Sequence, residues 1–275
     1  MVVIIDGMME FCGAATLLNK TWSSIKAYRL KPLRYLYSMQ GGAQRTSSFV
    51  SNRILLGLFS CCLPGSCNSK AKLRTKMAEP VIIPARGKHT ATIIFLHGLG
   101  DTGHGCPTRA VTLNFGMQMP AWYDLYGLTP SAEEDEEGIN ESTMILHSMI
   151  DAEIDSGIPS ERIMVGGFSM GGALALYAGL IYDKPLAGII GLSSFLVQRT
   201  KLPGNHTANK DVQIFMGHGG QDFLVPLSFG EMTEAYIKAF NPNIRMKVYP
   251  RMAHSSCPEE LVDTKEFIAQ RLPVI

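Results

Sequence analysis

The sequence predicts an α/β fold in which helices cover both faces of a mostly parallel central sheet. From Glu79 onward, short apolar segments alternate with amphipathic ones. The apolar segments are rich in β-branched residues without interruption, which is typical of strands buried on both faces. The amphipathic segments repeat their apolar residues at helical spacing. Strands that alternate with helices favour a parallel sheet with helices on both sides.

The expected elements follow in order along the chain. Residues 90–96 (TATIIFL) are expected to form the first strand because they are almost entirely apolar and partly β-branched. Residues 137–156 are expected to form an amphipathic helix, since their apolar residues recur over helical turns with acidic residues between them. Further strands are expected at 163–167, 186–192, 212–216 and 244–249, and further helices at 173–180, 229–240 and 258–271.

The chain divides by charge near residue 78. Residues 1–78 contain 11 Lys and Arg against 2 Asp and Glu, whereas residues 79–275 contain 14 against 22. We expect 79–275 to form the folded domain and 1–78 to be a basic extension. A basic, serine-rich and acid-poor segment resembles an organelle transit segment, here a mitochondrial one. A disordered tail, or synthesis that begins at Met77, explains the same composition.

The six cysteines are too scattered for a disulfide framework, so a reducing compartment such as the cytoplasm is expected. Cys61 and Cys62, with Cys67 nearby, could accept S-acyl chains and give reversible, peripheral membrane association. Three free structural thiols are an equal alternative. The apolar run 54–67 is too short to cross a bilayer, which takes about 20 residues. Nucleic-acid binding is not expected, because the basic extension lacks regularly spaced aromatic residues.

A serine flanked by glycines stands where an expected strand meets an expected helix. Residues 167–171 (GFSMG) match the pattern G-x-S-x-G, which in this context forms a sharp turn that exposes the serine hydroxyl. Glycine at 167 and 171 would remove side chains that otherwise collide there. The bare pattern has a chance probability of about 0.1 in a chain of this length, and a packing corner is the alternative. The flanking strand and helix favour Ser169 as a nucleophile.

A nucleophilic serine needs a base, and the base needs an orienting acid. The expected chain order is serine, acid, histidine, with the acid and the histidine in loops after strands. Asp222 follows the strand expected at 212–216, and His254 follows the strand expected at 244–249. His218 precedes the acid and is expected to stabilise its loop. His206 lies in a polar loop, and His89 and His147 have no catalytic neighbour in the sequence.

Two backbone N–H groups are candidates for an oxyanion hole. One is that of Met170, which directly follows the serine. The other is that of Leu99, in the turn 97–100 that follows the first expected strand. Each correctly aimed donor is worth about 3 kcal/mol in a transition state.

Four segments resemble the signature blocks of the acyl-protein thioesterase and lysophospholipase family of α/β-hydrolases: FLHGLGDTGHG, GIPSERIMVGGFSMGGALALY, HGGQDFLVPL and MAHSSC. The resemblance covers nearly all of residues 79–274. It implies an α/β-hydrolase catalytic domain that needs no cofactor or metal and removes long acyl chains from S-acylated protein cysteines. Lysophospholipids are the alternative substrates, a general carboxylesterase is a related alternative, and an impaired hydrolase that binds lipid or protein is a third.

The resemblance also implies site residues. It makes Ser169 the nucleophile, Asp222 the acid and His254 the base, with Leu99 and Met170 as oxyanion donors. Apolar residues that correspond to the family's lid and acyl channel, or that are ordinary core, are Leu113, Met117, Trp122, Phe195 and Leu224.

Three departures from the family pattern stand out. The family usually has glutamine at the position of Met170 and tryptophan at the position of Phe195. Between Gly105 and Val111 the chain has five residues, where the family has a helix and a further strand. A parallel crossover takes a dozen or more residues, so both elements are expected to be missing. We therefore expect a gap beside the first strand, uncovered apolar surface and a loosely held Leu99.

Overall fold

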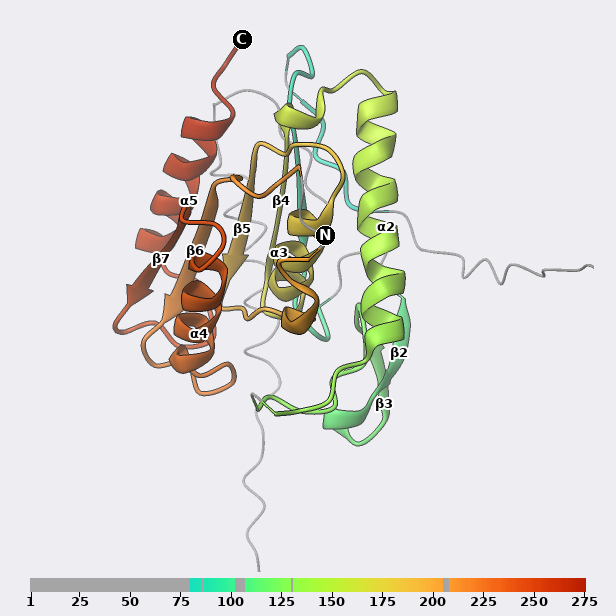
Figure 1. Ribbon diagram of the computed structural model, residues 1–275, viewed down its shortest axis with the longest axis vertical. Coiled ribbons are helices and arrows are strands. Elements are labelled where there is room, and N and C mark those ends of the chain that lie inside the picture. The colour runs from blue at the N-terminus through green and yellow to red at the C-terminus, as the bar shows by residue number, and fades with distance from the viewer. Residues whose placement is uncertain (1–79, 86, 102–106, 130, 205–207) are drawn as a thin grey trace, which may run out of the picture. The chain divides into compact units, whose positions relative to one another are not determined.

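The computed structural model describes residues 80–275 apart from 86, 102–106, 130 and 205–207 (Figure 1). The basic extension, His206 and five of the six cysteines lie outside the described residues. The hypotheses of targeting and S-acylation therefore concern a part of the chain that the structure does not describe. In the part that it does describe, no helix is long and apolar enough to span a bilayer.

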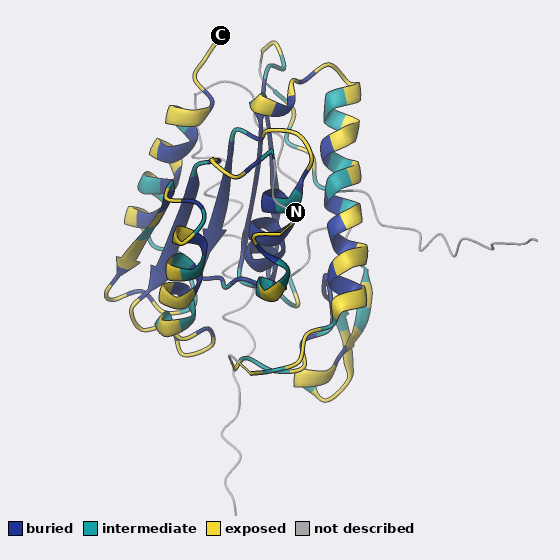
Figure 2. Ribbon diagram, viewed as in Figure 1, coloured by how far each residue is buried: buried dark blue, intermediate teal, exposed yellow. Residues whose placement is uncertain are grey.

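Five parallel strands form the central sheet in the order β1-β4-β5-β6-β7. Their side chains are mostly buried, as the dark strands of Figure 2 show. This confirms the predicted α/β architecture. The strands are β1 (Thr92–Leu96), β4 (Ile163–Phe168), β5 (Gly188–Leu192), β6 (Ile214–Gly219) and β7 (Ile244–Tyr249).

Helices cover both faces of the sheet. Alternate strand residues point to opposite faces of the sheet. On one face Ile94 belongs to a hydrophobic core shared with three helices, and on the other face Ile93 belongs to a second core shared with one helix. The first face carries α2 (Glu136–Asp155), α3 (Met170–Ile181) and α4 (Leu227–Lys238), and the second carries α5 (Pro258–Arg271). The predicted helices agree with these to within three residues at each end.

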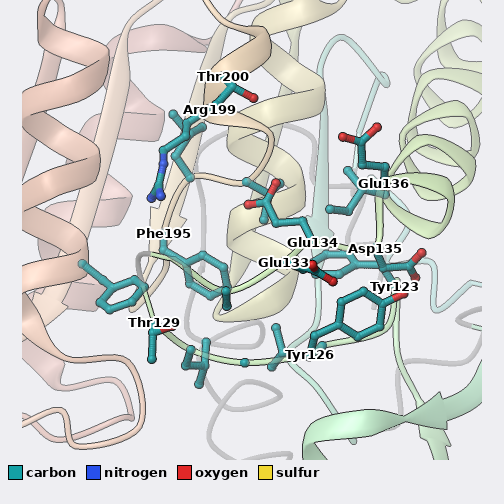
Figure 3. A pocket seen from close by; sticks show the side chains of 18 of the residues that line it. Tyr123, Tyr126, Thr129, Glu133, Glu134, Asp135, Glu136, Phe195, Arg199 and Thr200 are labelled. Carbon is teal, nitrogen blue, oxygen red and sulfur yellow. The ribbon is translucent and has the colours of Figure 1, made fainter.

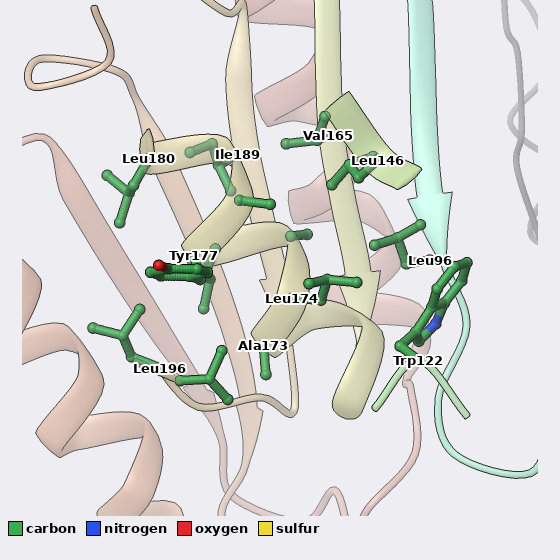
Figure 4. Packing of buried hydrophobic residues seen from close by; sticks show 14 of the residues in the cluster. Leu96, Trp122, Leu146, Val165, Ala173, Leu174, Tyr177, Leu180, Ile189 and Leu196 are labelled. Carbon is green, nitrogen blue, oxygen red and sulfur yellow. The ribbon is translucent and has the colours of Figure 1, made fainter. Parts of the chain in front are cut away.

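Helix α3 is buried along almost its whole length, between the sheet and α2 (Figure 4). Figure 4 shows Leu174 and Tyr177 of this helix among side chains of the sheet and of neighbouring segments. A Cβ at Gly179 would lie 2.8 Å from Ile189 Cδ1 and 2.9 Å from Val165 Cγ2. The missing side chain therefore lets the last turn of α3 pack closely on β4 and β5.

The structure adds an antiparallel hairpin that the sequence does not predict, formed by β2 (Thr108–Val111) and β3 (Met117–Pro120). The turn between them includes a 3-10 segment, Thr112–Asn114, and two residues with positive φ, Phe115 at 56° and Gly116 at 70°. A bulky residue rarely adopts positive φ. The strands are short and of mixed polarity, so neither periodicity nor turn composition indicates this hairpin.

The missing helix and strand leave the sheet continuous. Strand β1 is its edge strand and pairs with β4 in unbroken register, from Thr92 opposite Ile163 to Leu96 opposite Gly167. A gap is expected from the sequence beside the first strand. The structure shows that β1 instead forms the edge of the sheet and that the sheet of described strands is not interrupted. Of the apolar residues of β1, Ile93, Ile94 and Leu96 are buried and Phe95 is partly buried, contrary to the expected uncovered apolar surface.

One buried carboxyl group of the fold has no compensating partner. Glu260, in the first turn of α5, is fully buried, and neither carboxyl oxygen has a hydrogen-bond partner among the described residues. The carboxyl packs on β6, where a Cβ at Gly217 would lie 2.3 Å from Oε1. Burial, with a smaller effect of Asp263, raises the pKa of Glu260 from 4.5 to about 8.

We predict that Glu260 makes the fold less stable as pH rises from 4.5 to about 8. The unfolded carboxyl loses its proton near pH 4.5 while the folded one keeps it, so stability falls by about 1.4 kcal/mol per pH unit across this window. Glu260→Gln cannot ionise and should remove this decline, raising Tm at pH 8 by several degrees. Thermal melts at pH 5 and 8 test this, with the exposed Glu266→Gln as control. An unchanged pH dependence in Glu260→Gln would refute it.

Candidate active site

Ser169 occupies the corner between β4 and α3. Its backbone has φ 53° and ψ −122°, a region that residues other than glycine adopt at a cost of about 1–3 kcal/mol. The corner is held on both sides, because the Ser169 N–H donates to Leu192 O at 2.8 Å and the Ser169 carbonyl accepts from Ala173 N at 2.9 Å. The side chain therefore projects from the end of the sheet at the N-terminus of a buried helix.

The two flanking glycines are required by close backbone contacts. A Cβ at Gly167 would lie 2.3 Å from the carbonyl carbon of Gly171. A Cβ at Gly171 would lie 2.4 Å from His97 O and 2.5 Å from Leu96 O. Real Cβ atoms do not approach backbone this closely, which confirms the interpretation of the glycines. They allow β4, α3 and the end of β1 to meet at Ser169.

The structure brings the three predicted residues together in one hydrogen-bonded chain. His254 Nε2 lies 3.0 Å from Ser169 Oγ, and His254 Nδ1 lies 2.7 Å from Asp222 Oδ2. The ring of Phe168 packs against the imidazole, with ring centroids 4.8 Å apart. In this geometry the hydroxyl donates to Nε2 and Nδ1–H donates to the carboxylate. Such an arrangement can remove the hydroxyl proton as the oxygen attacks a carbonyl carbon.

The carboxylate is itself held by its loop. Asp222 Oδ1 accepts from the N–H groups of Leu224 at 3.0 Å and Val225 at 2.8 Å. Burial alone would raise the pKa of Asp222, but the bonds from His254 and from these N–H groups outweigh it and the pKa is lowered. Asp222 is therefore ionised at neutral pH and can stabilise a protonated His254.

His218 supports the same loop, as the sequence predicts. Its ring is fully buried, and Nε2 lies 2.9 Å from the carbonyl oxygen of Val225, to which it donates. Burial lowers the pKa of His218, so this ring is neutral at neutral pH. It fixes the backbone that delivers two N–H groups to Asp222.

The turn that carries Leu99 is tied to the hairpin side of the molecule. The Gly100 N–H donates to Pro120 O at 2.9 Å, and Trp122 Nε1–H donates to His97 O at 3.0 Å. The expectation of a loosely held Leu99 is therefore wrong, because Pro120 at the end of β3 and Trp122 just beyond it hold the turn. The N–H groups of Leu99 and Met170 have no hydrogen-bond acceptor among the described residues, so both are available to an oxyanion.

A cavity of about 410 Å³ lies between the segment 123–136, the loop after β5 and helix α4 (Figure 3), and its lining residues do not include Ser169, Asp222 or His254. Figure 3 shows Tyr123, Tyr126 and Phe195 around it. Tyr123 also connects the cavity to the serine corner, since its hydroxyl lies 3.5 Å from the carbonyl oxygen of Met170. One charged group of the lining, Glu136, lies 3.1 Å from Lys201 Nζ.

The five predicted acyl-channel residues are placed differently from one another. Phe195 lines the cavity, where its ring packs edge-on against Phe229 at 6.1 Å. Trp122 is buried in the core (Figure 4), which favours a structural role for this residue. Leu113 and Met117 are half-exposed near the hairpin turn, and Leu224 is exposed beside Asp222. Their contact with an acyl chain stays a prediction.

Several cavity residues were missed from the sequence, notably Tyr123, Phe229 and Tyr236. They come from a loop and from α4, so no spacing along the chain groups them. Within the described ranges, no cluster of His, Cys, Asp or Glu could hold a metal ion.

Comparison with known proteins identifies the family. A model of the Phospholipase/Carboxylesterase family matches residues 77–110 and 106–272. The chain is 42% identical to acyl-protein thioesterase 1 of Neurospora crassa, covering 71% of this chain and 93% of the relative. It is 38% identical to acyl-protein thioesterase 1 of Gibberella zeae, covering 70% of this chain and 96% of the relative. The chain belongs to the Phospholipase/Carboxylesterase family of hydrolases.

Solved structures agree with this assignment and with the α/β-hydrolase fold. Arabidopsis thaliana SOBER1 superposes with a TM-score of 0.63 at 28% identity, covering 66% of this chain and 98% of that one. Zea mays acyl-protein thioesterase 2 gives a TM-score of 0.62 at 28% identity, covering 69% and 97%.

The comparisons also place the missing segment. The family match divides into two segments that share residues 106–110, a few residues after the turn that contains Leu99. The alignment with the Neurospora relative runs over 227 positions, but 71% of this chain is about 195 residues. About 30 positions of the alignment therefore have no residue of this chain. The shortening that the sequence predicts after Gly105 is a real difference from the relatives.

We predict that Gly171→Ala disrupts the serine corner. Alanine in a helix is favoured over glycine by about 1 kcal/mol, but the new methyl group would strike the Leu96 and His97 carbonyl oxygens. The collision should win, lowering the free energy of unfolding by about 2–4 kcal/mol and kcat at least tenfold. Chemical denaturation and esterase assays measure both. Gly87→Ala, with open space around it, is the control, and a stabilised, active Gly171→Ala would contradict the account.

Proposed function

We propose that this protein is an acyl-protein thioesterase that removes long-chain acyl groups from S-acylated protein cysteines through an acyl-enzyme. The observation that carries the proposal is the hydrogen-bonded chain from Ser169 through His254 to Asp222. The names of the Neurospora and Gibberella relatives support the thioester as the substrate bond.

The first step is attack on the thioester carbonyl. His254 Nε2 takes the proton of Ser169 Oγ as the oxygen bonds to the carbonyl carbon, and Asp222 stabilises the imidazolium. The carbonyl oxygen becomes an oxyanion that the N–H groups of Leu99 and Met170 stabilise. Collapse of this intermediate breaks the carbon–sulfur bond. The cysteine sulfur takes the proton from His254 and leaves as a thiol.

The second step reverses the roles of the same groups. Water enters after the thiol has left, His254 takes one of its protons, and the hydroxide attacks the Ser169 ester. The second tetrahedral intermediate uses the same two N–H groups. Its collapse returns a proton from His254 to Ser169 Oγ and releases the fatty acid.

The acyl chain is proposed to lie in the cavity lined by Phe195. Aromatic and aliphatic side chains make up about half of the cavity wall, where Phe195 and Phe229 lie, and the acidic residues of 133–136 form much of the rest. The wall reaches the residue after Ser169 through Tyr123. Burying the chain there would contribute about 0.8 kcal/mol per methylene group, which favours long acyl groups over short ones.

Lysophospholipids are the second candidate substrates, since the family description includes phospholipases. Their ester carbonyl presents the same chemistry to Ser169. Comparing kcat/KM for an S-palmitoyl peptide and for a lysophosphatidylcholine of equal chain length separates the two activities, and a preference for the lysolipid would overturn the thioesterase proposal.

An impaired hydrolase that binds lipid or protein is the remaining candidate, favoured by the missing segment. The location of the protein is a separate proposal. A cytoplasmic protein with peripheral membrane association is proposed here, and targeting to mitochondria by residues 1–78 is the alternative. Phe115, 95% exposed at the hairpin turn, supports reversible contact with a membrane surface.

We predict that Ser169→Ala lowers kcat for a long-chain thioester by about 10⁴-fold or more, because the covalent route is lost. Circular dichroism should show an unchanged fold. Ser148→Ala, on the exposed side of α2, is the control and should retain full activity. Wild-type protein that melts cooperatively but turns over no ester would instead support the binding alternative.

We predict that Phe195→Trp shortens the preferred acyl chain. The larger indole would reduce the cavity, so KM for a palmitoyl thioester should rise several-fold while KM for a butyryl thioester changes little. Kinetics over chain lengths of 4 to about 16 carbons test this. Equal effects on short and long chains would place the acyl chain elsewhere.

A further inference from the structure

His97 is a buried histidine that the proposed reaction does not use. It directly follows β1, its side chain is 3% exposed, and its ring lies 5.1 Å from the ring of Trp122. Its Nδ1 lies 2.7 Å from the carbonyl oxygen of Gly98. A carbonyl oxygen only accepts hydrogen bonds, so Nδ1 carries the proton in this contact.

The state of the ring is fixed by its surroundings. Burial lowers the pKa of His97 to about 4, so the ring is neutral at neutral pH. In a neutral imidazole with the proton on Nδ1, Nε2 is an acceptor. Nε2 is buried and has no hydrogen-bond partner among the described residues. Moving the proton to Nε2 would bury an unpaired N–H and break the bond to Gly98.

That bond determines which way the next peptide group faces. Gly98 O and the Leu99 N–H belong to one trans peptide, in which the two groups point in opposite directions. With the carbonyl turned to His97, the Leu99 N–H points away from the imidazole. The peptide is also next to the nucleophile, because a Cβ at Gly98 would lie 3.4 Å from Ser169 Cβ and 3.2 Å from the Phe168 ring.

We propose that His97 is a positioning residue for the oxyanion site: its Nδ1–H holds the Gly98 carbonyl so that the Leu99 N–H faces the substrate oxygen. This inference rests on the proposed function. If the peptide rotated by half a turn, a carbonyl oxygen would face the developing negative charge and oppose it. The Asp101 N–H also donates to Gly98 O, at 3.2 Å, so His97 provides one of two restraints on this peptide.

Two substitutions separate positioning from packing. Asparagine carries its amide nitrogen as many bonds from Cα as His97 Nδ1, whereas glutamine carries it one bond further. Both remove the ring, so both should lower Tm similarly. We expect His97→Gln to lower kcat about 10- to 100-fold with KM within about threefold, and His97→Asn to stay within about fivefold of wild type. His147→Asn, whose amide nitrogen is one bond too short to replace the His147 Nε2 contact with the Ala178 carbonyl, should lower Tm alone.

Equal losses in His97→Asn and His97→Gln, or no loss in either, would overturn the inference. If neither variant folds, histidine ¹⁵N spectra of the wild-type protein still decide: His97 protonated at Nδ1 supports the proposal, and protonation at Nε2 overturns it. The two proposals fail separately. An inactive wild type would sink the proposed function, whereas an active wild type with a normal His97→Gln would sink only the role of His97.

Discussion

The close approach of three backbone segments at Ser169 is the constraint on which the site depends. Only glycine at 167 and 171 lets the β4–α3 corner press against the carbonyl groups at the end of β1. This contact brings the hydroxyl and the Leu99 turn together. The parallel sheet then supplies the other groups, because the loops after β6 and β7 leave the same edge and carry Asp222 and His254 to the hydroxyl.

Strands and helices with a periodic pattern of apolar residues could be predicted from the sequence. Features that depend on contacts between distant residues could not. The strands and helices of the sheet follow from apolar periodicity, and Ser169, Asp222 and His254 were found because each follows a strand. The hairpin was missed because its turn uses a positive φ at Phe115, which residue type does not indicate. The cavity was missed because Tyr123 and Phe229 meet only in the folded chain.

The missing segment changes the edge of the fold and leaves its centre in place. β1 keeps its register with β4, and the turn after it is tied to Pro120 and Trp122, beyond the shortened connection. A loose turn is expected from the sequence alone because these two hydrogen bonds join residues that are far apart along the chain. Trp122 therefore acts on the site from the core, by holding the backbone of His97.

The central claim is that Ser169, His254 and two backbone N–H groups form one working site despite the missing segment. A crystal structure of the full-length protein after reaction with a long-chain fluorophosphonate tests this most directly. The account predicts a covalent bond from Ser169 Oγ to phosphorus, with the phosphonyl oxygen within about 3 Å of both the Leu99 and Met170 nitrogens. An unmodified Ser169, or a phosphonyl oxygen turned away from Leu99, would contradict it.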